Sequence, residues 1–251
     1  MTQWQTFVVV GDSFTEGLDD PDGAGGYRGW ADLVASRLAA PGFRYANLAV
    51  RGKLLDDVVA EQLPAAVAMA PELVSFAAGG NDVMRRSYRP AAVRVTLDDV
   101  IGKLTATGAQ VLMFTAADVT TTLPRSILPR VLSFNDTIRE VAASHGATLV
   151  DLWSDDGFGH VRMWSEDRLH LGTLGHRRVA ANVLAALGVA YPQVWRAAPA
   201  PVRRTSWLAD RRADLKWARL HLAPWVHRRL TGRSSGDGRQ PKRPQLAPLE
   251  P

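Results

Sequence analysis

Residues 6–17 read TFVVVGDSFTEG, and this stretch decides the fold. It joins an apolar, β-branched run, typical of a buried strand, to a tight turn that begins at Gly11. Four more runs of this kind follow, separated by stretches whose apolar residues lie three and four positions apart, as in helices. The further strands are predicted at 44–48, 73–77, 110–114 and 147–150, and the helices at 28–40, 53–69, 91–107, 128–145 and 173–188.

The alternation of strands with helices predicts a parallel sheet made of βαβ units. Gly108 and Gly146 lie where helices should end before the next strand, and Pro71 precedes the third strand. Because βαβ crossovers are right-handed, the helices should cover both faces of the sheet. The sequence therefore predicts an α/β fold, a three-layer α/β/α sandwich around a five-stranded parallel sheet.

The composition of the 251 residues is that of a globular protein, with 46% hydrophobic and 22% charged residues. This excludes collagen-like, low-complexity and wholly disordered chains. Cysteine is absent, which excludes disulfides, thiolate metal sites and a cysteine nucleophile. The first ten residues do not resemble a secretory leader, and no run of about 18 apolar residues occurs. We therefore expect a soluble, cytoplasmic protein.

Charge is unevenly distributed along the chain. Residues 1–200 contain 18 Lys and Arg against 21 Asp and Glu, and residues 201–251 contain 12 against 4, so the net charges are −3 and +8. Eight of the fifteen prolines lie between Pro192 and Pro251, where they interrupt regular structure. These shifts predict a folded domain over 1–195, a basic helical extension over 196–230 and a disordered tail over 231–251.

The extension contains one amphipathic stretch, residues 203–226. Its apolar stripe, which Arg211 interrupts, consists of Trp207, Leu208, Leu215, Ala218, Leu222, Trp225 and Val226, and Arg212, Lys216 and Arg219 flank it. Such a helix can lie on an anionic membrane surface, fold back on the body or pair with another chain, and the last two are the favoured interpretations. No nucleic-acid partner is expected, because the tail does not match a recognised RNA-binding or DNA-binding module.

Ligands of open parallel sheets bind beyond the carboxyl ends of the strands, so the loops there carry the candidate site. These loops contain GDSFTEG at 11–17, VRG at 50–52 and GGND at 79–82. The segment after the last strand ends in DRLH at 167–170. One rim of the sheet should therefore hold a serine, two glycine-containing turns with an asparagine, and an Asp/His pair.

These residue types match the needs of nucleophilic catalysis. A serine hydroxyl needs an adjacent base, and a third group must hold that base in the right tautomer. Ser13, His170 and Asp167 supply the nucleophile, the base and the orienting acid. The tetrahedral intermediate carries an oxyanion that needs fixed donors, for which we predict the Ser13 N–H, the Gly52 N–H and the Asn81 amide.

The four blocks GDSFTEG, AVRG, GGND and DRLH, in this order, resemble those of the SGNH hydrolases, also called the GDSL esterase/lipase family. The resemblance covers about residues 5–188. It implies a flavodoxin-like sandwich and assigns Ser13, Gly52, Asn81 and His170 to the four residues that name the family, with Asp167 as the triad acid. Phe14 replaces the leucine of the common GDSL spelling, and Arg51 replaces a residue that is often smaller, which bears on the choice of substrate.

The resulting prediction is a serine hydrolase that cleaves small carboxylic esters through an acyl-enzyme on Ser13, without a metal or organic cofactor. Two alternatives stay open: an acyltransferase with the same acyl-enzyme, and a scaffold without turnover that acts through its basic tail. The segment 203–226 is the candidate contact with a membrane or a protein partner.

Other candidate groups are disfavoured. His176 is expected to be packed or solvated rather than a second base, and Asp12 and Asp82 to brace loops. The cluster of Asp155, Asp156 and His160 lacks the spacing of a metal site. No phosphate-binding glycine motif follows a strand, which disfavours nucleotide binding.

Overall fold

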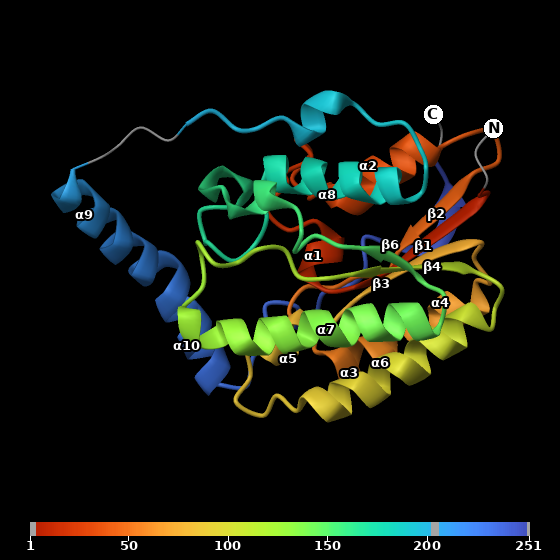
Figure 1. Cartoon of the computed structure of the whole chain (residues 1–251), viewed down its shortest axis with the longest axis horizontal. Helices are drawn as coiled ribbons and strands as arrows, with labels where there is room; N and C mark the ends of the chain where they lie inside the picture. Colours follow the sequence, from red (N-terminus) through yellow and green to blue (C-terminus); the bar gives the residue numbers. More distant parts are fainter. Residues whose placement is uncertain (1–3, 202–205, 250–251) are drawn as a thin grey trace.

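The computed structural model describes residues 4–201 and 206–249, and it has a central sheet between two layers of helices (Figure 1). The strands are β1 (Thr6–Gly11), β2 (Arg44–Asn47), β3 (Leu73–Ala77), β4 (Gln110–Phe114), β5 (Thr148–Val150) and β6 (Arg243–Pro248). The helices of the body are α1 (Ser13–Glu16), α2 (Gly29–Leu38), α3 (Leu55–Glu61), α4 (Leu63–Ala68), α5 (Gly80–Val83), α6 (Pro90–Thr105), α7 (Leu128–Ser144) and α8 (Thr173–Ala186). Short 3₁₀ turns lie at Arg125–Ile127, Asp156–Gly159, Val161–Met163 and Gln193–Arg196.

The strand order is β5-β4-β3-β1-β2-β6, and β1 to β5 are parallel. Helices α2 and α8 pack together on one face of the sheet, and α6 and α7 pack on the other (Figure 1). The predicted three-layer α/β/α sandwich is thereby confirmed. The chain runs from β1 to β2 on one side and returns past β1 to β3 on the other, so the crevice beyond the end of β1 is where this fold binds ligands.

Strand β6 corrects two expectations. The sheet has six strands rather than five, and the disorder expected over 231–251 is wrong for residues 243–248, which pair antiparallel with β2. Prolines and charges in this segment suggested disorder, but an edge strand tolerates proline because one of its sides needs no partner. Leu246 and Leu249 pack against the core, and the Lys242 amine donates to the Asp32 carboxylate at 2.8 Å.

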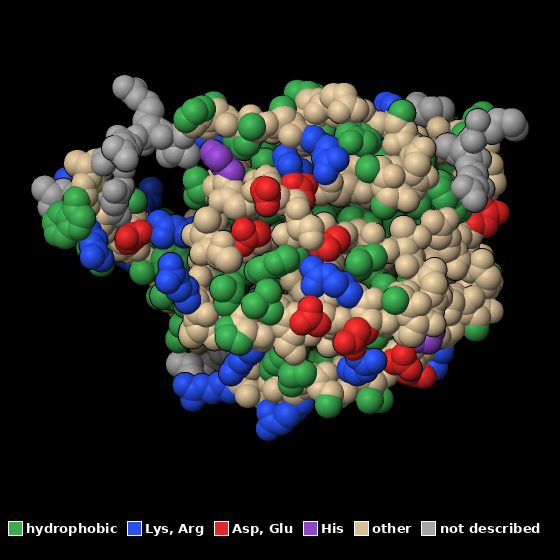
Figure 2. All heavy atoms as spheres, viewed as in Figure 1, with side chains coloured by type: hydrophobic (Ala, Val, Ile, Leu, Met, Phe, Trp, Pro, Cys, Tyr) green, Lys and Arg blue, Asp and Glu red, His purple; other side chains and the backbone are tan. Residues whose placement is uncertain are grey.

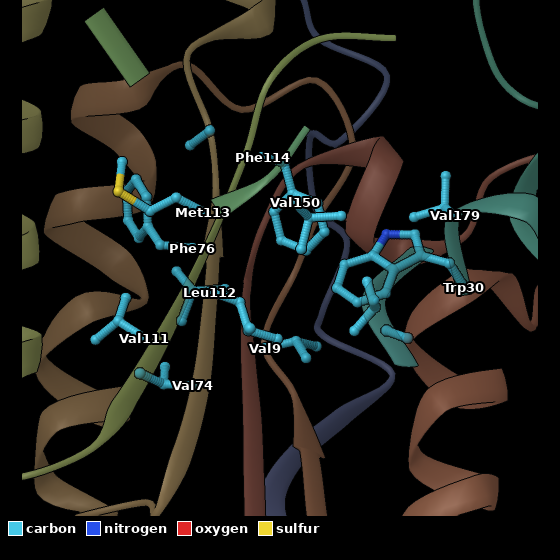
Figure 3. Close-up of a cluster of buried hydrophobic side chains, with 14 of the residues drawn as sticks. Val9, Trp30, Val74, Phe76, Val111, Leu112, Met113, Phe114, Val150 and Val179 are labelled. Atoms are coloured by element: carbon cyan, nitrogen blue, oxygen red, sulfur yellow. The ribbon is translucent and has the colours of Figure 1, made fainter. Parts of the chain in front are cut away.

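The core of the body has an apolar layer on each face of the sheet. Figure 3 shows Trp30 of α2 and Val179 of α8 on one side of the strands, and it also labels Val9, Val74, Phe76, Val111, Leu112, Met113, Phe114 and Val150. Trp30 contacts Phe114 with the ring centroids 4.9 Å apart. Burial of these side chains fixes the strands, and therefore fixes the loops that follow their carboxyl ends.

The stretch predicted as one helix at 53–69 is divided into α3 and α4 at Gln62. Pro64, two residues after Gln62, lacks the N–H that a continuous helix would use. The Gln62 side chain donates to the carbonyl oxygen of Gly11 at 2.9 Å and accepts from its N–H at the same distance. The break therefore ties this helix pair to the end of β1.

The extension forms α9 (Trp207–Trp217), a π-helical segment η5 (Ala218–Leu222) and α10 (Ala223–Leu230). Pro224 accounts for the interruption, because its ring excludes the regular i→i−4 hydrogen bond. Of the predicted stripe, Trp207, Leu215 and Leu222 are exposed, whereas residues 203–205 and the side chain of Leu208 lie outside the described part of the chain. Within the described residues, no helix has both the length and the hydropathy that crossing a bilayer requires.

Candidate active site

Ser13 begins α1 directly after β1, at the reversal in the strand order. Asp12 caps this short helix, because its Oδ1 accepts a hydrogen bond from the Phe14 N–H at 3.1 Å. Gly11 is required at the turn, since a Cβ there would collide with the carbonyl oxygen of Ala77. Ser13 is only 7% exposed, so its hydroxyl lies inside the crevice rather than on the outer surface.

The three side chains predicted as a triad form one hydrogen-bonded chain. The Ser13 hydroxyl lies 3.0 Å from His170 Nε2, to which it can donate. On the other edge of the ring, Nδ1–H donates to Asp167 Oδ2 at 2.5 Å. An imidazole held in this way can take the serine proton as the hydroxyl attacks a carbonyl carbon.

Asp167 is fixed by its own loop. Its Oδ1 accepts hydrogen bonds from the Ser165 hydroxyl at 2.6 Å, the Leu169 N–H at 2.8 Å and the His170 N–H at 2.9 Å. Arg168 between them has φ 60°, which reverses the chain so that the carboxylate and the imidazole of the same loop meet. The other oxygen of Asp167 therefore stays on the imidazole.

Burial and pairing have opposite effects on these two groups. Burial alone would raise the pKa of Asp167, but its hydrogen bonds and the charge of His170 hold that pKa well below the usual range. Burial alone would lower the pKa of His170, but the hydrogen bond and charge of Asp167 outweigh it, so the pKa is raised above its ordinary value. Asp167 is therefore ionised at neutral pH, and it favours the imidazolium that forms when His170 takes a proton.

A second carboxylate, which the sequence did not mark, faces the imidazole. Asp19 Oδ2 lies 4.0 Å from His170 Nδ1, and its charge contributes to the raised pKa of His170. Asp19, Asp167 and His170 offer ligand atoms within 4.8 Å of one another. His170 Nδ1 and Asp167 Oδ2 are already hydrogen-bonded to each other, so neither atom is free to bind a metal ion. The cluster therefore fits a base held in one orientation better than a metal site. Asp19 has φ 68° in a loop that no motif distinguishes, so it could not be selected from the sequence.

The loops of Gly52 and Asn81, predicted as oxyanion donors with Ser13, meet beside the serine turn. Asn81 Nδ2 donates to the carbonyl oxygen of Lys53 at 2.9 Å and to Asp12 Oδ2 at 3.2 Å. Gly52 has φ 73°, a conformation that favours glycine. The bond between Asn81 and Lys53 fixes the amide against the loop of Gly52, and the longer bond to Asp12 is the one that an oxyanion could replace.

Asp12 and Asp82 both brace loops, as expected. Burial raises the pKa of Asp12 to about 6, and the hydrogen bond from the Phe14 N–H opposes that rise. Asp82 Oδ2 accepts from the N–H of Leu55 at 2.9 Å, which links the GGND turn to α3. These carboxylates therefore hold the loops that carry Ser13 and Asn81.

Arg51, one of the two residues that depart from the family pattern, makes structural contacts with Glu16 and Tyr27. Its backbone N–H donates to Glu16 Oε2 at 2.7 Å, and its Nε donates to Glu16 Oε1 at 2.9 Å. The guanidinium lies over the Tyr27 ring, 5.0 Å from the centroid. Glu16 therefore neutralises the charge of Arg51, so that charge is used to connect α1 to the loop of Gly52.

A cavity of about 200 Å³ opens beside the hydroxyl of Ser13. Ser13, Asn81 and His170 belong to its lining. Most of the remaining wall is apolar, from β3, β4, α5, α7 and the loop after β4, and includes Phe76, Val83, Phe114, Leu123, Val131, Phe134 and Ile138. A hydrocarbon group attached to a carbonyl at Ser13 could be buried here.

The disfavoured groups have other partners. His176 is 1% exposed, accepts from the Trp30 N–H at 3.3 Å, and donates to the carbonyl oxygen of Leu18 at 3.0 Å. Burial lowers the pKa of His176 to about 4, so it is a neutral, packed histidine. The Asp155 carboxylate accepts hydrogen bonds from Arg178 Nε at 2.9 Å and from Asn182 Nδ2 at 2.7 Å. Both partners belong to α8, so Asp155 holds that helix in place.

Comparison with known proteins places this arrangement in a family. Residues 9–178 match the GDSL-like Lipase/Acylhydrolase family. The chain belongs to that family. Because the match includes Ser13, Gly52, Asn81, Asp167 and His170, the membership supports ester hydrolysis as the activity of this site.

Solved structures of similar proteins share the fold of this GDSL-type chain. TesA is 31% identical, with 73% of this chain and 98% of that chain covered and a TM-score of 0.60. LAE5, titled an alpha/beta hydrolase enzyme from the metagenome of Lake Arreo, Spain, is 25% identical, with 73% and 95% covered and a TM-score of 0.63. Axe2, an acetylxylan esterase from Geobacillus stearothermophilus, is 19% identical, with 74% and 95% covered and a TM-score of 0.62, a likeness that concerns the fold alone.

One curated relative is similar over a shorter stretch. Over 81 residues the chain is 37% identical to the uncharacterized protein YpmR of Bacillus subtilis (strain 168). The stretch covers 31% of this chain, and it spans about a third (32%) of the length of YpmR. This similarity adds no activity to the family assignment.

Proposed function

We propose that this chain hydrolyses carboxylic esters through an acyl-enzyme on Ser13. The observation that carries the proposal is the hydrogen-bonded chain from Ser13 through His170 to Asp167 at the mouth of an apolar cavity. Ser13 is the nucleophile, His170 the base and then the acid, and Asp167 the group that orients and stabilises the imidazolium. The apolar cavity takes the acyl group, so esters of aliphatic acids are the substrate class.

The first half of the reaction forms the acyl-enzyme. Ser13 Oγ attacks the carbonyl carbon, its proton passes to His170 Nε2, and the π electron pair moves to the carbonyl oxygen. The N–H groups of Ser13 and Gly52 and the amide of Asn81 stabilise that oxyanion. When the tetrahedral intermediate collapses, the bond to the alcohol oxygen breaks, and the alkoxide takes the proton from His170.

The second half releases the acid. Water enters, gives a proton to His170 Nε2 and attacks the acyl carbon, and collapse of the second intermediate returns the proton to Ser13 Oγ. An alcohol in place of water would give acyl transfer from the same intermediate. The acceptor therefore decides whether the enzyme behaves as a hydrolase or as an acyltransferase.

The test uses a serine-reactive phosphonate probe and p-nitrophenyl esters of increasing acyl length. The probe should label Ser13, and Ser13→Ala should abolish labelling and turnover without lowering the melting temperature. Ser36→Ala, on the exposed side of α2, is the matched control and should keep both. Turnover by Ser13→Ala above a few per cent of wild type would reject the acyl-enzyme, and faster transfer to an added alcohol than to water would identify an acyltransferase.

A further inference from the structure

Helices α9 and α10 lie beside the active site without joining the apolar core. In Figure 1 the strands run toward α1, and α9 and α10 lie at that end of the molecule. None of the described side chains of α9, η5 and α10 belongs to the core or packs against it. These helices therefore have a role other than completing the core.

The inner face of α9 is attached to the loop of the triad. The indole Nε1–H of Trp217 donates to the carbonyl oxygen of Asp167 at 2.9 Å. Arg168 forms an ion pair with Asp214 at 2.9 Å, and its guanidinium lies over the Trp217 ring, 5.0 Å from the centroid. The C-terminal end of α9 is thus attached to the loop of the triad at Asp167 and Arg168, which lie three and two residues before His170.

The segment after α10 is attached to the opposite side of the site. The Ser234 hydroxyl donates to the carbonyl oxygen of Gly52 at 3.1 Å. Gly236 packs so closely on the carbonyl oxygen of Arg51 that a Cβ there would collide with it. The extension therefore runs from the Asp167 loop to the Gly52 loop, past the crevice that contains Ser13.

The outer face of these helices is apolar and basic together. Leu215 is 73% exposed, Leu222 41% and Val226 39%, although a leucine or valine side chain is usually buried in a folded protein. Arg212, Lys216 and Arg219 are exposed beside them, at positions three and four apart on the same helices. Figure 2 shows hydrophobic and basic side chains intermixed at this end of the molecule.

Positive charge is concentrated in this segment. Residues 206–233 contain seven basic residues, Arg211, Arg212, Lys216, Arg219, Arg228, Arg229 and Arg233, and two acidic ones, Asp210 and Asp214. Residues 1–200 have a net charge of −3, so this excess belongs to the extension rather than to the whole protein. An amphipathic helix with cations beside its apolar stripe has the chemistry that binds at the surface of an anionic bilayer.

We infer that the outer face of α9, η5 and α10 binds an anionic lipid surface and holds the active-site end of the protein against it. The aliphatic side chains enter the headgroup boundary, and the flanking cations face lipid phosphates. A second copy of the chain fits less well, because one helix face with three aliphatic side chains falls short of the roughly 800 Å² per partner that a stable interface buries. The surface would lie about one helix diameter, roughly 10 Å, from the loop of Asp167.

The experiment is flotation of the full-length protein with vesicles of equal parts phosphatidylcholine and phosphatidylglycerol, compared with vesicles of phosphatidylcholine alone. Binding should occur on the anionic vesicles only and should weaken as salt is raised. The same measurement on Ser13→Ala should give unchanged binding, because the inference does not depend on the proposed chemistry. Absence of binding at low salt would overturn the inference.

Charge reversal is the stronger test of the surface. Arg212→Glu with Lys216→Glu and Arg219→Glu should reduce binding to anionic vesicles at least a hundredfold, since each cation near an anionic surface contributes about fivefold. The control carries the same change in net charge elsewhere: Arg37→Glu, Arg44→Glu and Lys103→Glu. Equal loss in both variants would show attraction by net charge alone and would overturn the assignment to this face.

The apolar part is tested by Leu215→Ser with Val226→Ser, for which binding should fall at least tenfold. The matched control is Val95→Ser with Val194→Ser, two valines of the body that are 69% and 73% exposed. Turnover of a short soluble ester should stay within about twofold of wild type in both variants. Concentration-dependent dimers that Leu215→Ser and Val226→Ser abolish would overturn the inference in favour of a second copy of the chain.

Discussion

The body, which consists of the sheet and helices α1 to α8, and the helical extension α9 to α10 are held in the molecule by different kinds of contact. The body encloses a continuous apolar core, and its strand ends determine where Ser13 and Asn81 lie. The extension is attached by a few polar contacts, at the carbonyl oxygen of Asp167, at Arg168 and, through the segment that follows α10, at Gly52. The geometry of the reaction should therefore depend on the body, and the extension should affect it only weakly.

The largest effect is expected at the base of the triad. His170→Ala should lower kcat/KM for a soluble ester about 10⁴- to 10⁶-fold, the range found when triad members are removed from serine hydrolases. His145→Ala is the control, because His145 binds Asp98 at 2.9 Å on the surface of the body. Steady-state kinetics and a melting curve check both variants. If His170→Ala kept a tenth of the wild-type kcat/KM, the assignment of His170 as the base would be wrong.

A smaller effect is expected at Asn81, whose amide is the proposed side-chain donor to the oxyanion. Asn81→Ala should lower kcat about 10²- to 10³-fold and change KM little, because the proposed oxyanion exists only in the intermediate and in the transition states that flank it. The kcat and KM of this variant are measured with the ester that wild type turns over best. A rise in KM at constant kcat would instead make Asn81 a contact to the ground-state substrate.

The pH profile tests the electrostatics of the same loop. His170 must be neutral to accept the serine proton, and Asp167 raises its pKa above the ordinary value of about 6.5. Activity should therefore be full at high pH and be lost as the pH falls through a midpoint above 6.5. Asp19→Asn removes a charge that favours the imidazolium, so it should move this midpoint to lower pH.

Asp136→Asn, on the exposed face of α7, is the control for that shift and should leave the midpoint in place. The measurement is kcat/KM of a non-ionising ester from pH 5 to 9. A midpoint that does not move in Asp19→Asn would mean that the charge of Asp19 does not raise the pKa of His170, which would then depend on Asp167 and Asp12.

The same division of the molecule explains what could be predicted from sequence. Local patterns mark the five parallel strands, because buried strands need continuous apolar runs, and the residues of the site follow strand ends directly. Strand β6 was missed because its pairing with β2 depends on a distant partner, whereas its own residues include Pro244 and Pro248. Its apolar contacts through Leu246 appear only when the sheet edge is in place.

Within the site, the missed features are contacts between segments far apart in sequence. Asp19 approaches His170 across 151 positions, and Trp217 reaches the carbonyl oxygen of Asp167 from an extension with no motif. The bond between Asn81 and Asp12 was also missed, because both residues were assigned separate roles from their own turns. Sequence spacing identifies which side chains can react, and the tertiary fold determines what holds them.

The smallest effect is expected where the two regions meet. Trp217→Phe removes the indole donor to the Asp167 carbonyl and keeps an aromatic ring beneath Arg168. Because one hydrogen bond contributes roughly 1 kcal/mol net, kcat for a soluble ester should fall about fivefold at most, with the pH midpoint unchanged. Trp207→Phe, at the exposed start of α9, is the matched control and should have no effect. If Trp217→Phe lowered kcat a hundredfold or more, or shifted the midpoint of the pH profile, the extension would be shown to position His170. The reaction geometry would then not depend on the body alone.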